Sequence, residues 1–116
     1  MSSITTIKSN RDFRFCYRKG RSAGSRQLVL YCRRRADPQV RFGFVVSKKI
    51  GGAVERNRVR RVLREACRLN GEMFPPGGDY VLVARPEAAT MGLAQAEKII
   101  GSLLKNLSAG GKRPSF

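Results

Sequence analysis

The sequence predicts an α/β fold of the α+β kind, a two-layer sandwich of helices over a sheet of roughly four strands. Two features of the chain predict it. The first is that three segments have the alternation or the continuous apolar composition of strands. The second is that these segments are interleaved with others that have helix-terminal residues or apolar residues at helical spacing. The predicted order is helix, strands, helix, strand, helix, in one domain that covers residues 1–116.

The first predicted helix spans residues 9–18. Ser9 or Asn10 is suited to cap its N-terminus, and Gly20 is suited to end it. Phe13 and Tyr17 are four residues apart, so they lie on one face of this helix. Residues 1–8 and 108–116 are predicted to be loose termini.

Residues 26–34 and 40–47 alternate as strands do, and a turn around residues 36–38 makes the second segment the predicted partner of the first. One face of the pair is apolar and holds Leu28, Leu30, Cys32, Val40, Phe42, Phe44 and Val46. The other face is mixed and holds Val29, Tyr31, Arg33, Arg41, Gly43, Val45 and Ser47. Small residues on the mixed face predict a shallow groove that a nucleic acid backbone or base can approach closely.

Residues 79–85 contain an almost wholly apolar run from Tyr80 to Ala84. Such a run predicts an interior strand that is covered on both faces. Pro86 ends this strand, and residues 90–107 have the apolar spacing of a last helix.

The most informative segment is a basic helix that ends near Leu69. Its predicted apolar stripe consists of Val59, Val62, Leu63, Ala66 and Leu69. Its other face carries Arg56, Arg60, Arg61, Arg64 and Arg68. The alternative to a binding site is a solvated face, but solvated faces normally mix charges because like charges at i,i+4 repel one another. Since the planar fork of arginine matches phosphate, this face is predicted to bind an anionic partner.

The charge of the whole chain supports a polyphosphate partner. There are 24 lysines and arginines against 8 acidic residues, a net charge of +16. Residues 1–68 hold 19 of the basic and 4 of the acidic side chains, which places the binding surface in the first three-fifths of the chain.

Other classes of function are disfavoured by the residues present. The chain has no histidine, and its carboxylates form no paired-acid motif, so we expect no catalytic residue and no metal site in the protein itself. The three cysteines, Cys16, Cys32 and Cys67, are widely spaced and form no CxxC pattern. We therefore interpret them as buried free thiols of a protein in a reducing compartment. No apolar run approaches 18 residues and no signal-peptide pattern is present, so no membrane partner and a cytoplasmic location are predicted.

Several motifs, in order, resemble the bacterial ribonuclease P protein subunit. They are Ser47-Lys48-Lys49-Ile50-Gly51, Ala53-Val54, Arg56-Asn57-Arg58, Arg60-Arg61 and Arg64-Glu65, and the similarity extends from about Asn10 to Leu107. Gly52 departs from the family pattern, in which a polar residue is common. The resemblance implies a left-handed strand–helix–strand crossover that carries the Arg-Asn-Arg helix, whereas general topology rules favour a right-handed one.

The resemblance also implies a function. In this family the RNA subunit of a ribonucleoprotein endoribonuclease carries the chemistry, with Mg²⁺ held mainly by the RNA, and removes the 5′ leader of precursor tRNA. The surface implied to bind the catalytic RNA consists of Lys48, Lys49, Arg56, Asn57, Arg58, Arg60, Arg61, Arg64 and Arg68. The implied leader groove has Val29, Tyr31, Val45 and Ser47 as its floor and Phe13 and Tyr17 as its wall.

Two placements within these surfaces stay open. Arg58 falls near the apolar side of the helix, so it can instead cover the sheet edge. Phe13 and Tyr17 can be ordinary packing between helix and sheet instead of a binding wall.

Two further classes of protein share some of these features. A structural or ribosomal RNA-binding protein has the same charge and fold type but no role in tRNA processing. A helix-turn-helix protein needs a second helix a short turn before the reading helix, where this chain has a strand, so no DNA partner is predicted.

Overall fold

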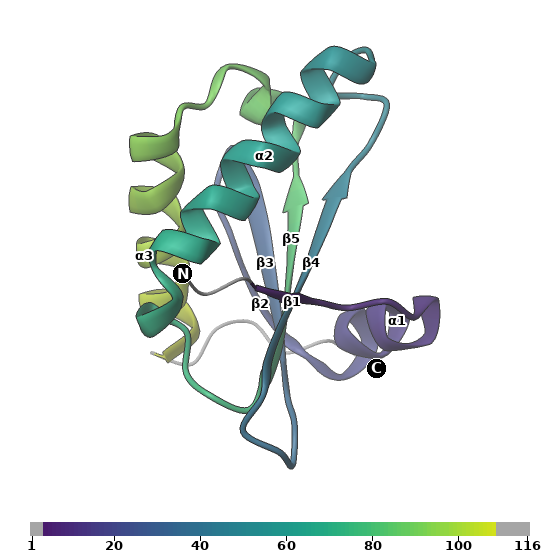
Figure 1. The fold of residues 1–116 in the computed structure, drawn as a ribbon, viewed down its shortest axis with the longest axis vertical. Helices are drawn as coiled ribbons and strands as arrows, with labels where there is room; N and C mark the ends of the chain where they lie inside the picture. Colours follow the sequence, from purple (N-terminus) through teal and green to yellow (C-terminus); the bar gives the residue numbers. More distant parts are fainter. Residues whose placement is uncertain (1–3, 109–116) are drawn as a thin grey trace.

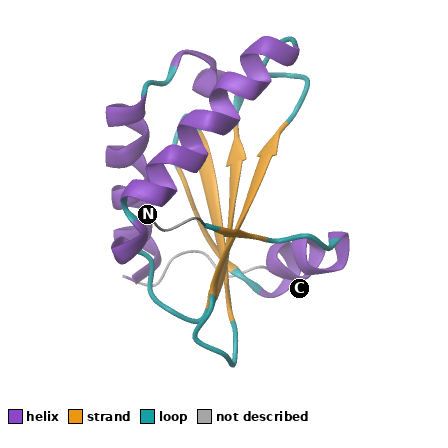
Figure 2. Ribbon diagram, in the orientation of Figure 1, coloured by secondary structure: helices purple, strands orange, loops and turns teal. Residues whose placement is uncertain are grey.

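The computed structural model describes residues 4–108, which form a mixed five-stranded sheet with helices on both faces (Figure 1). In chain order the elements are β1 (Thr5–Thr6), α1 (Asn10–Lys19), β2 (Arg21–Gly24), β3 (Leu28–Arg34), β4 (Val40–Val46), α2 (Ala53–Leu69), the 3₁₀ helix η1 (Gly71–Met73), β5 (Gly78–Ala84), the 3₁₀ helix η2 (Pro86–Thr90) and α3 (Leu93–Ser108). Figure 2 shows the same fold by type of element. The predicted α+β class is confirmed.

The short strands β1 and β2 bring the sheet to five strands, where the sequence predicted roughly four. β1 lies within the segment 1–8 that was predicted to be loose: Thr5 and Thr6 pair with β4, and Ile7 is buried. Two to four residues are too few to produce an alternating pattern, so only their pairing reveals them. The C-terminal residues 109–116, also predicted to be loose, lie outside the described residues.

The strand order is β1-β4-β5-β3-β2, which corrects the prediction that residues 40–47 pair with residues 26–34. β5 lies between them, parallel to β4 and antiparallel to β3. The most apolar strand takes this central place because there both its faces are covered and both its edges are paired. The helix α2 supplies the crossover that a parallel pair requires.

The crossover from β4 through α2 to β5 has the sense that the resemblance implied. In Figure 1 both strands point upward, α2 crosses in front of the sheet, and β5 lies to the left of β4. A connection of this sense is left-handed, against the usual preference.

The main core lies between the sheet and the helices α2 and α3. It includes Leu30, Phe42, Leu63, Leu82 and Ile100, each at most 3% exposed. The predicted stripe of α2 is wrong at one position: Leu69 is 51% exposed, whereas Cys67 is fully buried. Leu69 ends α2 just before the chain turns away into η1, so it has no element to pack against.

The helix α1 covers part of the opposite sheet face, where Ile7, Cys16 and Val81 form a second, smaller cluster. Ser9 caps α1: its hydroxyl accepts hydrogen bonds from the amides of Arg11 and Asp12 at 3.1 and 3.4 Å.

The register of β3, β5 and β4 arranges this second face in three rows. Arg33, Asp79 and Arg41 form the first row, Tyr31, Val81 and Gly43 the second, and Val29, Val83 and Val45 the third. The mixed face that the sequence predicted is therefore confirmed, with Asp79 and two valines of β5 inserted between its two halves.

Candidate nucleic-acid interface

The loop that leads into α2 is built to begin a helix beside a cluster of cations. The Gly52 amide donates a 2.8 Å hydrogen bond to Glu55 Oε1, and the Lys49 amide donates one to Ser47 Oγ. Gly51 has a φ of +150°, and a Cβ there would lie 3.1 Å from Glu55 Cβ, so the turn favours glycine. The side chains of Lys48 and Lys49 are exposed on this loop.

Besides Arg58, four of the predicted side chains on α2 make contacts within the protein: Arg56, Asn57, Arg60 and Arg68. Arg56 donates to the Gly51 carbonyl at 3.0 Å, and Arg60 donates to Asn57 Oδ1 at 3.1 Å. Arg68 pairs with Glu65 on the preceding turn, and these bonds hold the pKa of the Glu65 carboxyl below its ordinary value. Such half-exposed contacts are weak and leave the guanidinium groups accessible.

Arg58 differs from its neighbours because it is held by η2 and the residue after it. Its guanidinium donates to the backbone carbonyls of Ala89 and Met91 at 3.0 and 3.1 Å. The sequence left open that Arg58 covers the sheet edge; these bonds instead hold it against the segment that follows the central strand β5. It ties α2 to the segment between β5 and α3.

Arg61 and Arg64 are the exposed arginines on α2 whose side chains make no hydrogen bond or ion pair within residues 4–108. Two shallow hollows meet at this pair. One, of about 520 Å³, is lined by Phe44, Val54, Asn57, Arg60, Arg61 and Arg64. The other, of about 460 Å³, includes Ile4, Val62 and Leu93 as well as the arginines. The unpaired guanidinium groups beside these hollows are suited to bind phosphate.

The predicted groove residues come together only in part. Phe13, Tyr17, Tyr31 and Val45 are half-buried and pack around Ile7, Cys16 and Val81. Tyr17 and Tyr31 make an edge-to-face contact with ring centroids 4.9 Å apart. Burial is the main cause that raises the pKa of Tyr17, with Cys16 and Tyr31 as smaller causes.

Phe13 lies over Gly43, where a Cβ would come within 2.4 Å of the ring atom Cε1. Gly43 therefore makes the close approach of α1 to the sheet possible. Phe13 and Tyr17 pack between helix and sheet, and their rings remain partly exposed. Packing and a role as the wall of a groove are therefore compatible for these two residues.

Val29 and Ser47 lie farther along the same face. Val29 and Tyr31 line a hollow of about 770 Å³ together with Arg26 and Arg85, two exposed cations that the sequence reasoning did not select. Arg26 is the first residue of the predicted strand 26–34 and Arg85 the last of the predicted strand 79–85, and a cation at a strand end was the signal available for them. Ser47 is exposed just past the end of β4.

An ion-pair cluster in the first row of this face was also missed. Asp79 is fully buried, and Arg41 holds its two oxygens in a fork of two 2.8 Å hydrogen bonds. Asp12 of α1 lies 3.3 Å from Arg41 and 3.7 Å from Arg33. The bond to Asp79 is the main cause that raises the pKa of Arg41. The cluster anchors the first turn of α1, the helix that carries Phe13 and Tyr17.

No helix in the described part of the chain is long and apolar enough to cross a membrane. Within the same residues, no group of three or more His, Cys, Asp or Glu side chains is placed to hold a metal ion.

An arginine-bearing helix on one face of the sheet and partly exposed aromatic rings on the other are typical of a nucleic-acid-binding protein of the α+β class. Comparison with known proteins makes the class specific. The family described as Ribonuclease P matches residues 1–108. The ribonuclease P protein component of Pelotomaculum thermopropionicum is 44% identical over 105 residues, which are 90% of this chain and 94% of that protein.

Solved structures agree with this match. The RNase P protein of Staphylococcus aureus has a TM-score of 0.79 at 34% identity, over 90% of this chain and 96% of that one. The RNase P protein of Thermotoga maritima has a TM-score of 0.71 at 28% identity, over 88% and 93% of the two chains. The chain therefore belongs to the ribonuclease P protein family. It is the protein subunit of an endoribonuclease of tRNA processing and has an RNA partner in a ribonucleoprotein complex.

Proposed function

We propose that the chain binds the catalytic RNA subunit through α2 and the loop before it, and binds the 5′ leader of precursor tRNA on the sheet face beside α1. In this proposal the RNA carries the chemistry, and the protein assists Mg²⁺-dependent endonucleolytic removal of the leader. The structural or ribosomal alternative is set aside because the chain belongs to the ribonuclease P family.

The observation that carries the proposal is that Arg61 and Arg64 make no hydrogen bond or ion pair within residues 4–108, on a helix where Arg56, Arg60 and Arg68 are only weakly engaged. Together with Lys48 and Lys49 they form a cationic surface with few acidic neighbours. The planar fork of each arginine suits an RNA phosphate, and each contact adds salt-dependent affinity. Arg58 contributes mainly by holding α2 in place.

The leader assignment is supported by the half-exposed rings of Tyr31, Tyr17 and Phe13 next to the valine row of the sheet. Aromatic faces bind the bases of single strands with about 1 to 3 kcal/mol per base and with little regard to sequence. The cations Arg26 and Arg85 beside Val29 can hold the backbone of the same strand.

Mg²⁺ is assigned mainly to the RNA, because phosphate oxygens are ligands that Mg²⁺ prefers. Two of the protein's carboxylates, Asp12 and Asp79, are held by arginines. A cytoplasmic location is supported by the three cysteines, all of which are free thiols.

The test is cleavage of a precursor tRNA at low Mg²⁺ by the cognate catalytic RNA with and without this protein. The protein is expected to lower the Mg²⁺ requirement and to tighten precursor binding, and the protein alone is expected to cleave nothing. Cleavage by the protein, freed of contaminating RNA, would contradict the assignment of the chemistry to RNA.

The leader groove is tested by Tyr31→Ala with Tyr31→Phe as its matched control. Loss of the ring is expected to weaken the preference of the holoenzyme for leader-bearing precursor over mature tRNA by about 1 to 3 kcal/mol, whereas the phenylalanine variant keeps it. Affinity for the catalytic RNA is expected to stay nearly unchanged in both. A folded Tyr31→Ala protein that keeps its full preference for precursor would remove Tyr31 from the groove.

A further inference from the structure

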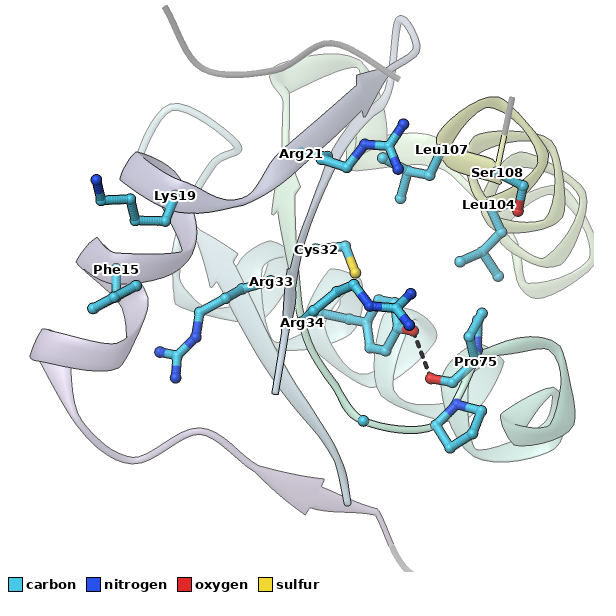
Figure 3. A pocket seen from close by; sticks show the side chains of 13 residues that line it. Phe15, Lys19, Arg21, Cys32, Arg33, Arg34, Pro75, Leu104, Leu107 and Ser108 are labelled. Atoms are coloured by element: carbon cyan, nitrogen blue, oxygen red, sulfur yellow. Dashed lines mark hydrogen bonds between the residues drawn. The ribbon is translucent and has the colours of Figure 1, made fainter. Parts of the chain in front are cut away.

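A pocket of about 550 Å³ lies where β2 and β3 meet α3 and the loop before β5 (Figure 3). None of the residues predicted for the basic helix or the leader groove lines it. Its volume is within the range of roughly 300 to 1,000 Å³ that is usual for small-ligand sites. Its lining combines apolar side chains with several cations, a pattern that the proposed function does not use.

Two of the cations, Arg21 and Arg34, project from neighbouring strands on the same side of the sheet. Arg21 pairs with Cys32 across the antiparallel β2 and β3, and Arg34 is two residues farther along β3. Diagonal neighbours of this kind have Cα atoms about 7 to 8 Å apart. Figure 3 shows both side chains on the same side of β3 as Leu104 and Leu107.

Neither guanidinium is neutralised by a carboxylate within residues 4–108. Among the buried side-chain nitrogen and oxygen atoms of residues 4–108, Arg21 Nε is the one that lacks a hydrogen-bond partner. By contrast, Arg33 in the same lining is near both Asp12 and Asp79. The charge of Arg21 therefore has no carboxylate partner within these residues, and an external oxyanion that reaches its guanidinium has no internal partner to displace.

The opposite wall of the pocket is apolar. It is formed by Leu104 and Leu107 of α3 and by Pro75. The Tyr80 hydroxyl, which would otherwise make this wall polar, donates a 2.6 Å hydrogen bond to the Pro75 carbonyl. A flat or apolar group can therefore lie against this wall while its anionic group reaches the arginines.

We propose that this pocket binds an unpaired nucleotide of an RNA strand, with its base against the wall of Leu104, Leu107 and Pro75 and its phosphates at Arg21 and Arg34. Each nucleotide of a single strand carries both required parts, a flat base and a phosphate. RNA is favoured over an acidic peptide because the chain has an RNA partner and because a peptide carboxylate carries no flat group of its own. The site is an RNA contact separate from α2 and from the leader groove.

The test uses the full chain and a 5′-phosphorylated adenosine dinucleotide, observed by NMR. Saturable shifts are expected at the methyl groups of Leu104 and Leu107 and at Arg21 Nε. Inorganic phosphate at equal ionic strength is expected to shift Arg21 Nε alone.

Three exposed positions supply the variants. Arg34→Gln should weaken dinucleotide binding about tenfold, the usual effect of losing one charge-assisted hydrogen bond. Ser108→Trp places a ring at the rim of the pocket without removing charge, and it should abolish the methyl shifts. Lys98→Gln removes the same charge from α3 outside the pocket and should have little effect.

Three outcomes would overturn the proposal. Methyl groups that do not respond to the dinucleotide would show that no base enters the pocket. Equal weakening by Arg34→Gln and Lys98→Gln would show attraction by net charge alone. Tighter binding of N-acetyl-aspartyl-phenylalanine than of the dinucleotide would assign the pocket to an acidic peptide. None of these outcomes bears on the leader groove, which Tyr31→Ala tests separately.

Discussion

Arg58 and Arg64 lie on the same helix but have different surroundings. Replacing each with alanine separates a role in stability from a role in RNA binding. Arg58 donates to two backbone carbonyls, one of them on Met91, which is 1% exposed. Arg64 is exposed and makes no hydrogen bond or ion pair within the described part of the chain. We expect Arg58→Ala to lower stability and Arg64→Ala to lower RNA affinity.

The magnitudes follow from these contacts. Loss of two hydrogen bonds from a charged donor should lower the free energy of unfolding of Arg58→Ala by about 2 to 4 kcal/mol. For a domain of this size that corresponds to a melting temperature lower by about 10 to 20 °C. Arg64→Ala should change the free energy of unfolding by no more than about 0.5 kcal/mol. It should instead reduce the slope of log K against log salt, for binding to the catalytic RNA, by about 0.7 to 0.9.

The assays are thermal unfolding of the isolated protein and RNA binding over a range of salt concentrations below the melting temperature. Arg58→Lys is the matched control, because it keeps the charge but cannot place two donors on both carbonyls. It should therefore recover little of the lost stability. The reasoning is refuted if Arg58→Ala melts at the wild-type temperature, or if Arg64→Ala leaves the salt slope unchanged.

Three further predictions concern the sheet and the core. Asp79→Asn should lower the free energy of unfolding by about 3 kcal/mol, because it leaves the guanidinium of Arg41 without its carboxylate. Urea unfolding is the measurement, and Asp37→Asn at an exposed position is the control. Gly43→Ala should displace the Phe13 ring, cost about 1 to 3 kcal/mol and weaken precursor preference, and an unchanged melting temperature would contradict this. Burial raises the pKa of Cys67 to about 12, so its contribution to stability is complete below the unfolded-state pKa of about 8.5 and is lost as pH rises toward 12. Between pH 8 and pH 10, Cys67→Ala should therefore lose about 2 kcal/mol less stability than the wild type in urea unfolding, and equal losses would contradict the assignment.

The sequence alone determined the features that repeat over short distances along the chain. Alternation gave the faces of β3 and β4, the continuous apolar run gave β5 as an interior strand, and helical spacing gave α2 and α3. These predictions succeeded because local periodicity decides which side chains share a face. The excess of positive charge in residues 1–68 was likewise evident from the sequence, since composition needs no coordinates.

The tertiary structure decided everything that depends on residues far apart in sequence. It placed β5 between β3 and β4, so Asp79 came to lie between Arg33 and Arg41. Along one helix it assigned Arg58 to the carbonyls of Ala89 and Met91, while Arg61 and Arg64 have no partner among residues 4–108. A helical wheel treats these arginines as nearly equivalent. Their roles differ because hydrogen bonding and burial are set by the neighbours that the fold brings to each side chain.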